Sequence, residues 1–546
     1  MIQEKSDLLQ SSTESIIHED KTFEKVEETE LGAQYDFETE FTEIEKLAEE
    51  AKRQSTFWQK FRNFEFEINF ENKKYMVWLL GAFASAAGLL SGLDQSIISG
   101  ASIGMEPALH LTSHQQSLVS SLMPLGAVAG SILMTPLNEY FGRKKSIMIS
   151  CVWYTVGAAL SAAAHEYHIM YAGRFILGVG VGIEGGCVGL YIAESVPAKV
   201  RGNIVSMYQF NIAVGEVLGF AVAAMFYSVK GGWRFMIGSS LLFSTLLFIG
   251  ISFLPESPRY LIHKNRLGEA YNVWKRLRDV EEYDSKVEFL EMRQAGIEEQ
   301  ERKNNESYVQ VWMDLFTVPR NRRSLVYAVI MISLGQLTGV NAVMYYMSTL
   351  MIKIGFDTKN AVFMSLVGGG SLMLGTIPAI LFMDRFGRRT WALNIVGFFF
   401  GLLLVAIGYR IDIETNLAAA EGVYLTGIIL YMGFFGAYAC LTWVLPSEAF
   451  SMQMRSVGMT ISSAFLYLWA FTVTYNFTKM QNAFTYTGLT LGFYGGIAFI
   501  GFIYQLFFMP ETKDKTLEEI DDIFNKPTMD IARENIANMK KFWGMK

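Results

Sequence analysis

Long apolar runs separated by short polar loops make up most of the sequence between residues 75 and 509. A run of about 20 apolar residues is the length an α-helix needs to cross the hydrocarbon core of a bilayer. The pattern predicts an all-α integral membrane protein with twelve transmembrane helices, six on each side of a polar stretch. The predicted spans are 76–100, 116–137, 146–164, 168–191, 204–227, 233–254, 324–349, 361–383, 390–409, 421–445, 457–477 and 486–509.

The polar segments divide the chain further. Residues 256–323 are rich in Lys, Arg and Glu, too polar for a span, and are expected to form short amphipathic helices between two bundles, 75–255 and 324–509. Residues 1–74 are expected to form a Glu-rich tail, largely without fixed structure, with a short amphipathic helix near 41–53. Residues 510–546 form a second tail.

Composition agrees with a membrane protein and excludes other classes. The 546 residues are 51% apolar and only 18% charged, whereas soluble domains carry about 25% charged residues. The net charge of −7 argues against a nucleic-acid partner. Residues 1–74 hold 19 acidic and 10 basic residues, so this tail carries −9 and the rest of the chain +2. The three cysteines lie inside apolar runs, which predicts no disulfide framework and no metal cluster.

The basic residues of the short loops predict the orientation. Loops on one side hold Arg143, Arg201 and Arg388 with further Lys and Arg residues, whereas 101–115 has none. Because short cytoplasmic loops are enriched in Lys and Arg, the basic side is expected to be cytoplasmic. Both termini and the segment 256–323 would then also be cytoplasmic.

An internal repeat relates the two bundles. Matching landmarks recur in the same order at offsets of 245 to 255 residues, which indicates two homologous six-helix halves in parallel orientation. The matched pairs are Phe141-Gly142-Arg143-Lys144 with Phe386-Gly387-Arg388-Arg389, Glu194 and Arg201 with Glu448 and Arg455, and Pro255-Glu256 with Pro510-Glu511. Parallel halves of this kind are known in major-facilitator transporters.

The motifs resemble those of the sugar porter family of the major facilitator superfamily over residues 75–520. The resemblance is carried by Gly92-Leu93-Asp94…Gly100, Asp384-Arg385-Phe386-Gly387-Arg388-Arg389, Pro255-Glu256-Ser257-Pro258-Arg259, Gln336-Leu337-Thr338-Gly339-Val340-Asn341 and Pro510-Glu511-Thr512-Lys513. It implies a fungal-type secondary transporter that moves a sugar or polyol by alternating access. The family implies the plasma membrane as its location and requires no cofactor.

Charged residues at the helix ends are expected to act in gating. A carboxylate such as Glu194 can pair with an arginine of the loop motif while the gate is closed, and opening would break the pair. The gating set is Gly142, Arg143, Glu194, Arg201, Asp384, Arg385, Gly387, Arg388, Glu448 and Arg455. The alternative is that these charges only set topology as solvated surface pairs.

Four charged residues fall inside predicted spans, where lipid-facing placement is costly. By resemblance, Asp94 and Arg174 match the pair of proton-coupled symporters, in which protonation of the carboxylate releases the arginine. A permanent structural ion pair is the alternative. Glu184 is assigned with them to proton coupling, and Glu216 to substrate binding, although either carboxylate can instead neutralise an arginine.

The substrate site is expected to use amides and an aromatic ring, because a polyhydroxyl ligand offers many donors and acceptors besides an apolar ring face. By resemblance, Gln209, Gln336, Asn341 and Trp443 join Glu216 there. Buried amides are otherwise often contacts between helices.

Several positions depart from the family pattern, which leaves the substrate open between a hexose, a modified sugar and a polyol such as inositol. The departures are Gly335, Leu372, Ala439, Cys440, Leu466 and Tyr467. The expected function is a proton symporter, and the alternatives are a facilitative uniporter and a nutrient receptor that does not transport. The sequence contains neither a P-loop motif GxxxxGK[ST] nor a zinc-protease motif HExxH, and no enzyme is expected.

Overall fold

The fold was obtained as a computed structural model. The structure describes residues 39–53 and 72–542 except 281, 306–307, 452–453, 514 and 516. The side chains of 198–203, 299, 302–305, 308–309, 384, 517–518 and 542 are also outside the described part. Most of the acidic tail predicted at 1–74 therefore lies outside the described residues.

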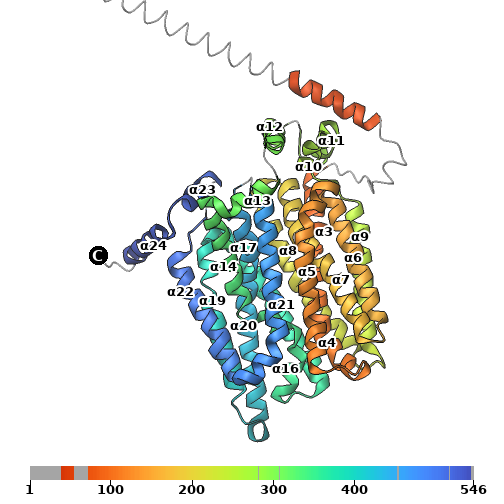
Figure 1. The fold of residues 1–546 in the computed structure, drawn as a ribbon, viewed down its shortest axis with the longest axis vertical. Helices are drawn as coiled ribbons and strands as arrows, with labels where there is room; N and C mark the ends of the chain where they lie inside the picture. Colours follow the sequence, from red (N-terminus) through yellow and green to blue (C-terminus); the bar gives the residue numbers. More distant parts are fainter. Residues whose placement is uncertain are drawn as a thin grey trace, which may run out of the picture.

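The N-terminal half is a bundle of long helices aligned with the long axis of the molecule (Figure 1). Its helices are α3 (Lys73–Ala86), α4 (Gly88–Ala108), α5 (Ser113–Phe141), α6 (Arg143–Ala163), α7 (Tyr167–Ser195), α8 (Ala198–Phe226) and α9 (Gly232–Ser252). Helices α3 and α4 follow each other at Ala87, which keeps α-helical dihedral angles, so together they make one crossing.

Four short helices follow and cover one end of the molecule, which we call the linker end (Figure 1). They are α10 (Pro258–His263), α11 (Leu267–Leu277), α12 (Tyr283–Asn305) and α13 (Tyr308–Thr317). The opposite end, where α4 ends and α16 lies, is called the far end.

The C-terminal half repeats the bundle. Its helices are α14 (Pro319–Gln336), α15 (Val340–Tyr345), α16 (Met347–Ile354), α17 (Thr358–Phe386), α18 (Arg388–Ala392), α19 (Ile395–Gly408), α20 (Ile413–Ala449), α21 (Arg455–Thr487), the π-helix η1 (Gly488–Gly495) and α22 (Gly496–Phe508). Two further helices, α23 (Leu517–Asn525) and α24 (Thr528–Phe542), return along the linker end.

The described residues contain eleven helical stretches long and apolar enough to cross a membrane. The stretch Arg455–Phe508 has 54 residues, about 80 Å of helix at ~1.5 Å per residue, against a hydrocarbon core of about 30 Å. Its backbone leaves the helical region at Thr485, with φ 64° and ψ 165°. This stretch therefore supplies two crossings, and the predicted all-α fold with twelve spans is confirmed.

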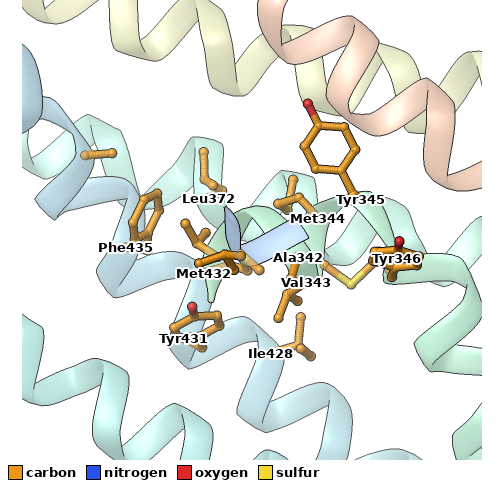
Figure 2. Packing of buried hydrophobic residues seen from close by; sticks show 14 of the residues in the cluster. Ala342, Val343, Met344, Tyr345, Tyr346, Leu372, Ile428, Tyr431, Met432 and Phe435 are labelled. Carbon is orange, nitrogen blue, oxygen red and sulfur yellow. The ribbon is translucent and has the colours of Figure 1, made fainter. Parts of the chain in front are cut away.

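The sequence predicts the seventh span as one helix over 324–349, but the structure divides this segment into three helices. Helix α14 ends at Gln336, and the chain continues through Gly339 into the short α15 and then α16. Gly339 has a φ of +91°, a value that favours glycine over residues with a Cβ. Figure 2 shows the α15 segment, from Ala342 to Tyr346, packed against Leu372 of α17 and Ile428, Tyr431, Met432 and Phe435 of α20.

The two halves touch along α5 with α21 and along α8 with α17. Near the linker end, the hydroxyls of Thr135 and Thr460 lie 2.6 Å apart. Near the far end, the His114 ring nitrogen lies 3.0 Å from the Tyr475 hydroxyl. Polar contacts therefore join the halves at both ends, with the centre of the molecule between them.

A helix at 39–53 lies where the sequence predicts an amphipathic segment. Its apolar face packs on α10, α11 and α12 through Phe41, Ile44 and Ala48, which are all at most 5% exposed. The end of the acidic tail is thus attached to the linker helices.

Candidate functional site

A cavity of about 80 Å³ lies between the halves and is lined by residues of both. Its walls come from α4, α5 and α8 on one side and from α14, α15, α17, α20 and α21 on the other. All five residues predicted to bind substrate line it: Gln209, Glu216, Gln336, Asn341 and Trp443. The polar groups selected by resemblance are thus brought together at one place.

The amide side chains that line the cavity form hydrogen bonds to one another or to the indole of Trp443. Trp443 Nε1 donates to Gln209 Oε1 at 3.0 Å, which joins α20 to α8. Asn341 Nδ2 donates to Gln336 Oε1 within the C-terminal half. These hydrogen bonds can be exchanged for bonds to a hydroxyl-rich ligand, because each amide keeps unused donor or acceptor capacity.

Glu216 has a different environment. It is 4% exposed, and its Oε2 has no hydrogen-bond partner among the described residues. Within the described part of the chain, its carboxylate lines the cavity without neutralising an arginine, which was the alternative left open by the sequence. A buried acceptor without a partner is unfavourable, so a ligand hydroxyl would satisfy it.

Sequence reasoning missed Gln95, which follows Asp94 on α4. Its Nε2 donates to Asn341 Oδ1 at 2.6 Å and so crosses from one half to the other inside the cavity. The available signal was an amide within an apolar span, which is uncommon. Gln95 occupies an unspecified position of the motif Gly92-Leu93-Asp94…Gly100, so the resemblance did not select it.

The departures from the family pattern are part of the wall. Leu372, Ala439, Leu466 and Tyr467 all line the cavity. In Figure 2, Leu372 lies near Met344 of the α15 segment. The side chains of Leu372, Ala439 and Leu466 therefore give the C-terminal wall of the cavity an apolar surface.

Asp94 and Arg174 form a buried ion pair between α4 and α7. Arg174 Nη1 lies 2.5 Å and 2.7 Å from the two carboxylate oxygens of Asp94, and both residues are at most 2% exposed. Arg174 Nε also donates to the carbonyl of Val119 on α5 at 3.1 Å. The pair therefore ties three helices of the N-terminal half together.

Glu184, predicted to act with that pair, has another partner. The Tyr208 hydroxyl donates to Glu184 Oε1 at 3.4 Å. The Tyr208 ring also meets the Trp443 ring edge-on, with centroids 5.2 Å apart. Tyr208 thus connects Glu184 to Trp443 of the cavity wall.

The predicted gating residues of the N-terminal half meet at the linker end. Gly142 turns the chain between α5 and α6 with φ +91°. Arg143 pairs with Glu194 at 2.7 Å, and the Ser257 hydroxyl donates to the same carboxylate. Glu256 accepts from the backbone N–H groups of Arg143, Lys144 and Ser257 at 2.9–3.1 Å.

The same arrangement recurs in the C-terminal half. Gly387 has φ +86°, and Arg388 pairs with Glu448 at 2.9 Å. Thr512 donates to Glu448 at 2.8 Å, as Ser257 does to Glu194. Glu511 accepts from the N–H groups of Arg388 and Arg389 at 2.9 and 3.0 Å.

Glu256 and Glu511 belong to the repeat and to the family motifs, but the sequence predicts no role for them. Their contacts place a carboxylate at the first N–H groups of α6 and α18, where the helix dipole favours negative charge. Burial raises the pKa of the Glu256 carboxyl, and the N–H groups of Ser257 and Lys144 and the charge of Arg143 oppose this rise. Both gating ion pairs form within one half, so they stiffen the ends of each bundle.

The remaining gating residues are less defined. The side chains of Arg201 and Asp384 lie outside the described part of the structure. Arg455 begins α21, and the carbonyl of Arg385 accepts from Lys513 Nζ at 3.0 Å. All three cysteines are buried and free, and the described residues hold no group of His, Cys, Asp and Glu suited to a metal ion.

The comparisons with known proteins agree with this architecture. Residues 39–524 match the family model "Sugar (and other) transporter". The chain belongs to this sugar transporter family. It is 57% identical to the myo-inositol transporter FST1 of Gibberella moniliformis over 96% of this chain and 90% of that protein.

Other relatives are more distant. A myo-inositol transporter of Schizosaccharomyces pombe is 30% identical over 85% of each chain, and the galactose-proton symporter of Escherichia coli is 31% identical over 82% of this chain and 95% of its own. Among solved structures, the proton:xylose symporter XylE bound to 6-bromo-6-deoxy-D-glucose aligns with a TM-score of 0.72 at 22% identity, over 83% of this chain and 100% of that one. The fold is therefore the major facilitator fold, and the protein is a secondary transporter, not an enzyme.

Proposed function

We propose that the protein is a proton-coupled transporter of a cyclic polyol, with myo-inositol as its substrate. The observation that carries the proposal is the cavity between the halves, which holds a carboxylate oxygen of Glu216 without a partner among the described residues and adjoins the helix that bears Asp94. The name of the 57% identical relative supports the choice of substrate.

The chemistry of the cavity supports a polyol. A carboxylate accepts hydrogen bonds but donates none, so Glu216 requires a ligand donor. An inositol presents a hydroxyl on every ring carbon, whereas a hexose ring has one oxygen that can only accept. The apolar wall at Leu372 and Leu466 fits the C–H face of the ring.

Helix α4 supports a link between proton and substrate. Asp94 bonds to Arg174 in its own half, and the next residue, Gln95, bonds to Asn341 in the other half. Protonation of Asp94 removes one charge of the pair and weakens the hold of α7 on α4. A shift of α4 then moves Gln95 in the cavity, so this one helix responds both to the proton on Asp94 and to the substrate.

The polar contacts at both ends support an occluded state of alternating access. Opening toward the linker end must separate Thr135 from Thr460, and opening toward the far end must separate His114 from Tyr475. The ion pairs Arg143–Glu194 and Arg388–Glu448 each lie within one half. They keep the linker end of each bundle rigid while the protein changes between its outward-open and inward-open states. We assign the linker end and both termini to the cytoplasm, because the basic loops gather at that end. We assign the protein to the plasma membrane on the family resemblance alone.

The test is uptake by the full-length protein in proteoliposomes. We expect radiolabelled myo-inositol to accumulate when the outside is made acidic, and a protonophore to abolish accumulation. Asp94→Asn should lose accumulation but keep exchange, whereas Glu106→Gln, an exposed residue of the same helix, should behave as wild type. Uptake unaffected by the protonophore would identify a uniporter, and binding without uptake a receptor.

A further inference from the structure

A second cavity, of about 240 Å³, lies in the C-terminal half at the linker end. It is bounded by the start of α14, the end of α22 and the C-terminal helices α23 and α24. Residues Pro319 and Phe508 are the ends of two candidate membrane spans. The cavity therefore lies at the level where the chain leaves the membrane, away from the transport cavity.

Cationic side chains line this cavity. Arg322, Arg323 and Lys526 are all part of its wall. Arg323 Nη1 donates to the carbonyls of Phe524 and Asn525 at 3.2 and 2.7 Å, which fixes its guanidinium against the end of α23. Lys526 pairs with Glu534 at 2.9 Å. Asp522 and Asp530 also act on the charge of Lys526, so Arg322 and Arg323 supply the positive charge of the wall.

A buried hydroxyl also lines the cavity. Tyr327 is 6% exposed, and its hydroxyl has no hydrogen-bond partner among the described residues. Its ring packs on Phe524 with centroids 5.4 Å apart, which holds the side chain in place. An acceptor atom within the cavity would satisfy this donor.

The rest of the wall is apolar or aromatic. Val326 of α14, Tyr504 and Phe508 of α22, and Ile531 of α24 contribute to it. Val326 is 50% exposed on the outer surface of its helix. Cations and a hydroxyl donor beside an apolar wall at membrane level suit a phosphate group carried on an apolar body.

We propose that this cavity binds the phosphate of an anionic amphiphile, with Arg322 and Tyr327 contacting the phosphate oxygens. Two sources share this chemistry: the headgroup of an anionic phospholipid and a soluble organic phosphate. The apolar wall and the position at membrane level favour the phospholipid. Because α14 also carries Gln336 at its other end, the bound group contacts the same helix as the transported substrate.

The test is native mass spectrometry of the full-length protein in detergent with added lipid. We expect phosphatidylinositol or phosphatidylserine to bind at least fivefold more tightly than phosphatidylcholine. Arg322→Gln should remove most of this preference, and Tyr327→Phe should weaken it several-fold. Arg410→Gln, an exposed arginine near the far end, is the matched control and should bind as wild type.

Two further measurements distinguish a phospholipid headgroup from a soluble organic phosphate and identify variants that do not fold. If millimolar glycerol 3-phosphate displaces the lipid from the wild type, and Arg322→Gln still weakens phosphate binding, the ligand is a soluble phosphate. Thermal unfolding of each variant confirms that it is folded before binding is compared. Equal binding of anionic and zwitterionic lipids, or wild-type binding by both folded variants, would overturn the proposal. The readout is binding, so it does not depend on which substrate is transported.

Discussion

Asp94 and Gln95 are consecutive residues of α4 that bond to opposite halves of the protein. The carboxylate of Asp94 receives Arg174 Nη1 at 2.5 Å within the N-terminal half. The amide of Gln95 reaches Asn341 of the C-terminal half, with 2.6 Å between Nε2 and Oδ1. A single helical step of about 100° therefore separates the coupling pair from the substrate cavity.

Replacing Gln95 with leucine should weaken substrate binding. The variant keeps much of the side-chain volume but loses the hydrogen bond to Asn341 and the donor available to a ligand. A hydrogen bond between neutral groups contributes about 0.5–1.5 kcal/mol, so we expect the apparent affinity for myo-inositol to fall roughly 2- to 10-fold. Isothermal titration of the purified protein measures this directly.

Gln294→Leu is the control for the chemical change, because Gln294 is exposed on α12. It should bind as wild type. An unchanged affinity in Gln95→Leu would mean that Gln95 only joins the halves and does not contact substrate.

The ion pair of Asp94 and Arg174 should show strong coupling in a double-mutant cycle. Removing one partner leaves a buried, unpaired charge, which costs about 3–5 kcal/mol. We expect Asp94→Asn and Arg174→Leu each to lower the unfolding temperature, and the double variant to unfold at a higher temperature than the poorer single variant.

The exposed pair Asp530–Arg533 on α24 is a control, with side chains 43% and 77% exposed. Such pairs contribute about 0–1 kcal/mol, so the same cycle there should give nearly additive effects. Additive losses at Asp94 and Arg174 would show that the two charges do not depend on each other.

The spans, the two halves and most of the cavity could be predicted from the sequence. Apolar runs of sufficient length report which segments cross the membrane, and the repeat placed Gly142 and Gly387 at equivalent turns. Hydropathy and internal repetition are properties that a single chain displays. The five predicted substrate residues line one cavity, but their positions were selected by resemblance to the family and not by the local pattern.

Other features depend on contacts that the sequence pattern does not contain. The break after Gln336 in the seventh span interrupts an apolar run without changing its hydropathy. The role of Gln95 depends on Asn341, 246 residues away. The pairing of Glu184 with Tyr208 instead of an arginine was likewise decided by packing between α7 and α8.

Alanine at Gly142 should destabilise the linker end of the N-terminal half. The backbone there has φ +91°, and a Cβ would lie too close to the Glu256 carboxylate and the Tyr260 ring. Left-handed backbone costs residues with a Cβ about 1–2 kcal/mol, and displacement of Glu256 adds to this. We expect Gly142→Ala to lower the unfolding temperature by several degrees, and Gly387→Ala to do the same through Glu511.

Gly189→Ala provides the matched control. This glycine lies within α7, and a Cβ added to it would meet no atom within 4 Å. Alanine also favours helix over glycine by about 0.5–1 kcal/mol, so the control should be neutral or slightly stabilising. Wild-type stability of Gly142→Ala would contradict the proposed anchoring by Glu256.

The helix at 39–53 should detach when its buried face is disrupted. Ile44 is 1% exposed against the linker helices, and Glu45 accepts from the Tyr271 hydroxyl at 3.3 Å. Burial, together with the Glu45 carboxylate, raises the pKa of Tyr271 to about 12, so the hydroxyl keeps its proton near neutral pH. Asn272 adds a hydrogen bond to the carbonyl of Ala48 at 2.8 Å.

Ile44→Asp removes apolar burial worth about 1.5–3 kcal/mol and places a charge in the interface. We therefore expect amide hydrogen exchange within 39–53 to accelerate by about 10-fold or more, with smaller increases in α11 and α12. Leu47→Asp makes a comparable change at a position of the same helix that is 45% exposed, and it should leave exchange near the wild-type rate. Equal acceleration by the two variants would mean that loss of helix propensity, and not loss of docking, controls exchange in this segment.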